Sequence, residues 1–159
     1  PIGGVLVSDR LATGLIEKGG EFNHGFTYSG HPVAAAAAIA NLNILMDEGI
    51  VDRVDKVIGP YTAEKWQPLT EHPLVGEARI IGLIGAIELV KDKDTRQFFA
   101  DRGEVGTICR DICIENGLVM RAVEDTMIMS PPLCISEGEI DDLVGLLTRC
   151  LDLTAEKVL

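Results

Sequence analysis

The chain has 159 residues, of which 47% are hydrophobic and 25% are charged, and its formal net charge is −11. This length suits one domain, or one small domain with a piece of another, and the hydrophobic content is ample for a core. The strong negative charge would repel nucleic acid and anionic lipid, so we exclude both as partners of the whole chain. No apolar run reaches the roughly 18–20 residues that span a bilayer, so we expect no membrane segment.

Cysteine usage indicates a reducing compartment. The chain holds Cys109, Cys113, Cys134 and Cys150, and no two of them form a C-x-x-C pair. Zinc would need a denser set of Cys and His ligands. We therefore expect no metal site, and we predict free, buried thiols in a cytoplasmic protein.

The first residues suggest a piece of a longer polypeptide. The chain begins at Pro1, without a methionine, and Gly4–Val7 is a short apolar run that predicts a buried strand. Natural domains seldom begin inside a strand. Ser8 or Asp9 would cap the helix that follows, and Gly19–Gly20 would end it.

A polar loop with two glycines, residues 22–31, then runs into a helix of very small side chains that reaches about Gly49. Pro32 suits the first position of that helix, and the alanines would let another backbone approach closely. Donors such as Thr27 and Tyr28 fit an anion or a polar cofactor group. A plain tight turn before a buried helix fits the residues equally well.

The rest of the chain predicts a small unit of helices and strands. The stretch from about Gly49 to Leu69 predicts a helix with a kink or a restart at Pro60, and the apolar runs 78–82 and 85–90 predict two strands or one bent strand. A helix over 105–116, a hairpin over 118–129 and a final helix capped by Ser136 and Glu139 follow. The boundary between two structural units would lie near residues 50–60.

Arg121 is the most informative charged residue, because it lies in the otherwise apolar segment 118–123. A buried guanidinium needs an anionic partner or an opening to solvent. Arg121 would clamp a carboxylate in bidentate fashion, or it would point outward from a sheet edge, and the residues alone leave both readings open. Lys18, at a helix end, suits the helix dipole and is interpreted as structural.

Three separated motifs carry a resemblance to a known family. They are Pro1-Ile2-Gly3-Gly4-Val5, Phe26-Thr27-Tyr28-Ser29-Gly30-His31-Pro32, and Gly117-Leu118-x-x-Arg121 with Asp125 and Ser130-Pro131-Pro132-Leu133. In this order they resemble the class III (omega) aminotransferases, which are pyridoxal-phosphate enzymes of fold type I. The resemblance covers essentially the whole chain. It looks closest to members that transfer amino groups from diamines or other amines to pyruvate.

The resemblance implies roles for three residues. Thr27 matches a threonine that hydrogen-bonds the cofactor phosphate in the partner subunit of a homodimer, and the backbone at Phe26 lies next to the same phosphate. Arg121 matches an arginine that binds the substrate's carboxylate and can swing aside for an amine. The implied partners are therefore a small-molecule amine, a keto acid and a second copy of the chain.

The resemblance also implies the fold class, α/β, with this chain an α+β fragment. Residues 1–58 would end the large cofactor-binding domain, and residues 59–159 would form the small C-terminal domain. The family's Schiff-base lysine stands upstream of Pro1, so no catalytic residue is assigned and we expect the chain alone to be inactive. Two alternatives stay open: an aminomutase, racemase or decarboxylase of the same fold, and a non-catalytic interaction domain.

Overall fold

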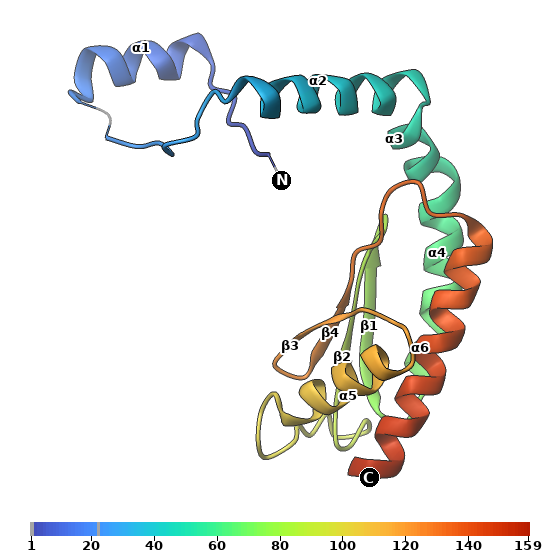
Figure 1. Ribbon diagram of the computed structural model, residues 1–159. Coiled ribbons are helices and arrows are strands. Elements are labelled where there is room, and N and C mark those ends of the chain that lie inside the picture. Colours follow the sequence, from blue (N-terminus) through green and yellow to red (C-terminus); the bar gives the residue numbers. More distant parts are fainter. Residues whose placement is uncertain (1, 22) are drawn as a thin grey trace. The chain divides into compact units, whose positions relative to one another are not determined.

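The computed structural model describes residues 2–21 and 23–159, and the chain divides after Glu48 into two compact units. Figure 1 shows the elements of each unit along the chain. The division comes earlier than the domain boundary expected after residue 58. Gly49, in the left-handed conformation at φ 60°, separates the two units, and Ile58 is fully buried in the core of the second. The assignment of these units to domains of a larger enzyme stays a prediction.

The first unit contains two helices that begin and end where the sequence predicts. Helix α1 spans Asp9–Lys18, with Ser8 and Gly19 as its flanking residues. Helix α2 spans Pro32–Asp47 and has Pro32 at its first position. No residue of either helix is buried. The unit therefore has no core of its own among its described residues.

The buried strand predicted at Gly4–Val7 is wrong for this structure. These residues form no strand, and the side chains of Val5 and Leu6 are 90% and 100% exposed. A strand needs a neighbouring strand to pair its backbone groups, and the described residues of this unit supply none. Phe22, the first residue of the predicted loop, lies outside the described residues.

The second unit opens with one long helical stretch that is interrupted before Pro60, as the sequence predicts. Its segments are α3 (Ile50–Arg53), the π-helix η1 (Val54–Ile58), α4 (Gly59–Trp66) and the 3₁₀ helix η2 (Gln67–Glu71). Proline lacks an N–H, and its ring clashes with the carbonyl four residues earlier in a straight helix. The wider π turn accommodates this, because the Gly59 N–H donates to the Val54 carbonyl five residues back.

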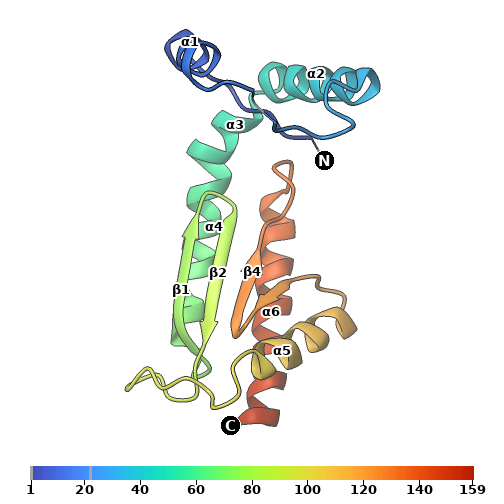
Figure 2. The ribbon, with the colours of Figure 1, turned by 90° about the vertical axis from the view of Figure 1, so that its left-hand side faces the viewer.

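A four-stranded antiparallel sheet forms the centre of the second unit, in the order β1-β2-β4-β3. The strands are β1 (Val75–Ile81), β2 (Ile84–Leu89), β3 (Arg121–Val123) and β4 (Thr126–Met129). In Figure 2 helices α4 and α6 (Glu137–Val158) lie behind the sheet, and α5 (Glu104–Glu115) packs against α6 and the strands β3 and β4. The mixture of helices and strands agrees with the predicted fold class.

The core lies between the sheet and these helices. Trp66, Ile87, Met127 and Leu147 are among its largest buried side chains. Burial of this apolar surface, at about 25 cal/mol per Å², is the main stabilising term for the unit.

The cysteines follow the prediction with one exception. All four are free, and Cys109, Cys113 and Cys150 are buried. The pKa of the Cys113 thiol is raised, chiefly by a hydrogen bond with the Cys109 thiol and secondly by burial. Cys134 is exposed, so the prediction is wrong for this residue. It lies in the irregular link after Pro132 rather than on the inner stripe of a helix.

Candidate functional site

The loop before α2 is a compact turn that uses its own polar groups. The Phe26 N–H donates to Ser29 Oγ at 3.1 Å, and the Ser29 N–H donates back to the Phe26 carbonyl at 2.9 Å. The His31 N–H donates to the Tyr28 carbonyl at 3.2 Å. Gly30 has φ 72°, a left-handed backbone conformation that is energetically unfavourable for most residues with a Cβ but not for glycine. The chain is thereby turned back to enter α2 at Pro32.

Thr27 lies in this turn with its donors unused. Within the described part of the chain, neither its hydroxyl nor its N–H has a hydrogen-bond partner, and the same holds for the Tyr28 N–H. The turn is exposed, and it leads directly into the N-terminus of α2, the positive end of a helix dipole. One hydroxyl and two amides in this setting fit a phosphate group.

Phe26 differs from Thr27 in this respect. Its N–H and its carbonyl both already bond Ser29, and its side chain is exposed. Thr27 and Tyr28 therefore offer free donors for a phosphate, and the bonds of Phe26 close the turn that presents them. That the Phe26 backbone lies next to the phosphate stays a prediction. The fit to pyridoxal phosphate rests on this free donor set.

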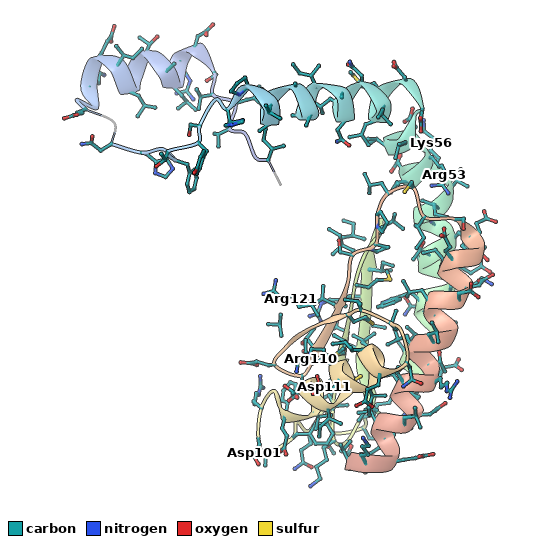
Figure 3. The ribbon with its side chains drawn as sticks, in the orientation of Figure 1. Arg53, Lys56, Asp101, Arg110, Asp111 and Arg121 are labelled. Carbon is teal, nitrogen blue, oxygen red and sulfur yellow. The ribbon has the colours of Figure 1, made fainter. Side chains whose placement is uncertain are left out.

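Arg121 belongs to the second unit and is described by itself. It opens β3, the edge strand of the sheet, opposite Ile128 of β4. Its side chain is exposed, and no ion pair or hydrogen bond to it exists among residues 2–21 and 23–159. Figure 3 shows Arg121 on the side of the sheet away from α6. The guanidinium is thus at a sheet edge and unpaired, which leaves it available to a carboxylate.

Sequence reasoning missed the anchor of the hairpin that carries Arg121. Asp125, in the turn between β3 and β4, is only 5% exposed. Its Oδ1 accepts a hydrogen bond from the Gly106 N–H at 2.9 Å, and its carbonyl accepts one from the Leu89 N–H at 2.9 Å. The sequence could identify Asp125 only as a turn residue, because its partners lie far from it along the chain.

Other site classes find no support in the described residues. No group of three or more His, Cys, Asp or Glu side chains there could hold a metal ion. Among the residues that the structure describes, no single helix is long and apolar enough to cross a bilayer, whereas α2 and the stretch Ile50–Glu71 together have the length and apolar composition of a bent span. Lys18 lies in the last turn of α1, as expected for a structural role.

Comparison with known proteins decides the family. The family described as Aminotransferase class-III matches residues 1–151. The chain belongs to this family. The resemblance proposed from the three motifs is therefore confirmed.

Relatives within the class-III aminotransferases match almost the whole chain. The putrescine–pyruvate aminotransferase of Pseudomonas aeruginosa is 55% identical over 159 residues, which are 100% of this chain and 34% of that protein. The mitochondrial gamma aminobutyrate transaminase 1 of Solanum lycopersicum is 37% identical over 161 residues, covering 99% of this chain and 31% of that protein. The chain thus spans about a third of the length of these relatives.

A solved structure supports the fold. The PMP-bound form of an aminotransferase from Vibrio fluvialis is 33% identical and superposes with a TM-score of 0.82, over 94% of this chain and 33% of that one. The likeness confirms the predicted fold class, a fragment of the transaminase fold.

Proposed function

We propose that the whole protein is a pyridoxal-phosphate-dependent aminotransferase that moves an amino group from a diamine, such as putrescine, to pyruvate. The observation that carries this proposal is the 55% identity to a putrescine–pyruvate aminotransferase along the entire chain. An ω-amino acid such as γ-aminobutyrate is the second candidate donor, favoured by the relative that is 37% identical.

Thr27 and Tyr28 would hold the cofactor phosphate. Pyridoxal phosphate, when bound, supplies the electron sink for the substrate's amino carbon and stores the amino group between half-reactions. The Thr27 hydroxyl and the two free amides would donate to phosphate oxygens, and hydrogen bonds to a charged group are worth about 1.5–3 kcal/mol each. The Phe26–Ser29 bonds would keep these donors in place.

Arg121 would select the keto acid. Its planar guanidinium matches a carboxylate in bidentate fashion. Pyruvate carries such a group, whereas a diamine presents a second ammonium that the arginine would repel. Since no partner within the described residues holds Arg121, the side chain is free to bind the carboxylate in one half-reaction and to turn toward solvent in the other.

The protein would work as a homodimer in the cytoplasm. In this proposal Thr27 reaches the cofactor of the partner subunit. The apolar side chains that the first unit leaves exposed, such as Leu6 and Ile16, support a larger assembly that covers them. The three buried free thiols suit a reducing compartment.

The two units would correspond to two domains of the whole enzyme. We assign residues 2–48 to the end of the large, cofactor-binding domain. Residues 49–159 would be the small C-terminal domain, with the boundary after Glu48 rather than after residue 58 because Ile58 belongs to the core of the second unit.

Donor preference tests the proposed reaction. Full-length protein supplied with pyridoxal phosphate is mixed with pyruvate and either putrescine or γ-aminobutyrate, and the initial rate of alanine formation is measured. We expect kcat/KM for putrescine to exceed that for γ-aminobutyrate by about tenfold or more, a difference of roughly 1.4 kcal/mol in transition-state binding. A preference for γ-aminobutyrate would overturn the assignment of the donor, and the absence of alanine with both would overturn the function.

A further inference from the structure

We propose that Asp125 is a positioning residue for Arg121, acting together with Gly106 by fixing the β3–β4 hairpin to α5. The inference rests on the carboxylate-binding role proposed for Arg121. It assigns to two residues outside the binding site the task of holding the guanidinium where a carboxylate can meet it.

The tip of the hairpin is a junction of three elements. Glu124 and Asp125 form the turn, and the Asp125 carbonyl accepts from the Leu89 N–H at the end of β2. The Asp125 carboxylate accepts from the Gly106 N–H in the first turn of α5 at 2.9 Å. A buried carboxylate with such bonds is costly to remove, because its partners lose their acceptor inside the protein.

Helix α5 needs this carboxylate. Its N-cap residue is Gly103, which has no side chain to accept a bond from the free amides of the first turn. Asp125 takes that place from a distant part of the chain, and its negative charge also suits the positive end of the helix. The other carboxylate oxygen of Asp125, Oδ2, is buried without a hydrogen-bond partner in the described chain. Burying an unsatisfied carboxylate oxygen costs free energy of folding. We take this cost as a sign that the carboxylate is needed to hold the hairpin turn at a fixed position against α5.

Gly106 allows the close approach of the two elements. A Cβ added at this position would lie 2.0 Å from the backbone oxygen of Glu124 and 3.0 Å from the Asp125 Cα. Any side chain at position 106 would therefore push the turn away from α5. The hydrogen bond and the absence of a side chain together define one position for the hairpin tip.

The opposite end of the Arg121 segment is anchored to the same helix. The Leu118 N–H donates to the Cys113 carbonyl at 2.8 Å, close to the C-terminal end of α5. Residues 118–125 are thus fixed to both ends of α5, with Arg121 between the two anchors. Because β3 is a three-residue edge strand whose one neighbour among the described strands is β4, loss of the tip anchor would leave Arg121 poorly fixed.

Kinetics of the two half-reactions test this role. In a ping-pong reaction, kcat/KM for each substrate reports on its own half-reaction. In the full-length enzyme, we expect Asp125→Ala and Gly106→Ala to lower kcat/KM for pyruvate by roughly tenfold, because small displacements of a binding group have effects of this size or greater. The value for putrescine, which has no carboxylate, should change by less than about twofold.

Matched variants separate positioning from general stability. Asp125→Asn keeps an oxygen that can accept the Gly106 N–H bond, so its kcat/KM for pyruvate should be close to that of the unsubstituted enzyme. Gly145→Ala is the control for the added methyl group, because a Cβ at this helix position would meet nothing within 4 Å. Leu147→Ala is the control for lost stability, because it removes a buried core side chain on α6, far from the hairpin turn in sequence. Both should leave the ratio of the two kcat/KM values unchanged. Amide hydrogen exchange supplies a second readout: Asp125→Ala should speed exchange in residues 121–129 relative to α6.

The outcomes distinguish this inference from the function on which it rests. The inference is supported if Arg121→Ala lowers kcat/KM for pyruvate and Asp125→Ala has little further effect in that background. If Arg121→Ala acts on pyruvate but neither Asp125→Ala nor Gly106→Ala does, the positioning role is wrong and the role of Arg121 stands. If Arg121→Ala leaves pyruvate unaffected, the role of Arg121 is wrong and the inference falls with it.

Discussion

The hydroxyl of Tyr61 on α4 lies within hydrogen-bond distance of both carboxylate oxygens of Asp141 on α6, at 2.9 and 2.8 Å. Lys65, one turn further along α4, completes the group with its Nζ 3.0 Å from Asp141 Oδ1. The ammonium also lies 5.1 Å from the centre of the Tyr61 ring. This polar cluster joins the helix that follows the π turn to the C-terminal helix.

The cluster predicts a pH dependence of stability. Two hydrogen bonds lower the pKa of Asp141: the one from Lys65 has the larger effect, and the one from Tyr61 the smaller. A carboxyl whose pKa is depressed by folding stabilises the protein above its unfolded pKa, near 3.9, and loses that contribution as the pH falls through the folded value. Asp141→Asn should therefore lose less stability than the unsubstituted protein when the pH is lowered from about 5 to 3.

Urea unfolding at several pH values measures this difference. Asp142→Asn is the control, because it removes a neighbouring carboxylate that has no ion pair among the described residues. Equal pH slopes for the Asp141 variant and the unsubstituted protein would show that the cluster contributes nothing.

Gly85 on β2 is predicted to tolerate no larger residue. A Cβ there would lie 2.9 Å from Trp66 Cζ2 and 3.1 Å from Met129 Cε. Because Trp66 is fully buried, it has little room to move, and Gly85→Ala should destabilise the protein by about 1–3 kcal/mol. Gly145→Ala in α6 meets nothing within 4 Å and should stabilise by about 0.5–1 kcal/mol. Denaturant midpoints that change in the same direction for both substitutions would contradict this packing.

The two units, expressed as separate polypeptides, should differ in their ability to fold. Residues 49–159 contain the whole hydrophobic core that surrounds Trp66 and Leu147, so this segment should unfold cooperatively by itself. Residues 1–48 should not, because no described residue of α1 or α2 is buried, and short helices without tertiary packing are marginal in water. Thermal unfolding followed by circular dichroism tests both segments. A cooperative transition in the shorter one would refute the prediction.

Thr27→Ala should weaken binding of the cofactor to the full-length protein. Loss of one hydrogen bond to a charged phosphate corresponds to about 1.5–3 kcal/mol, or roughly tenfold or more in Kd for pyridoxal phosphate. Thr27→Ser keeps the hydroxyl and should bind nearly as well as the unsubstituted protein. Equilibrium dialysis measures both. Equal Kd values for the alanine and serine variants would exclude the hydroxyl as a phosphate ligand.

Local signals in the sequence predict most of the secondary structure. The Ser136–Glu139 capping box forms at the start of α6 as expected, and Gly117, at φ 84°, ends α5. The first residue of α2 is Pro32. Each of these signals acts within one or two turns of the chain, so no knowledge of the tertiary structure is needed to interpret it.

Features that depend on distant residues could not be predicted in this way. Arg53 donates to the Ile135 carbonyl at 2.6 Å across 82 residues of chain. Asp125 reaches Gly106 across 19 residues. Gly4–Val7 has the composition of a strand but no partner in the described chain. Whether a polar residue is a turn former or an anchor, and whether an apolar run is a strand, is decided by neighbours that the local sequence does not reveal.

Transfer of labelled nitrogen tests the central claim most directly. Full-length protein with pyridoxal phosphate is supplied with ¹⁵N-putrescine and unlabelled pyruvate, and the nitrogen-containing products are identified by mass spectrometry. We predict that the label appears in alanine, in step with the putrescine consumed. Label that is released as ammonium, remains in a rearranged diamine, or does not leave putrescine would contradict an aminotransferase.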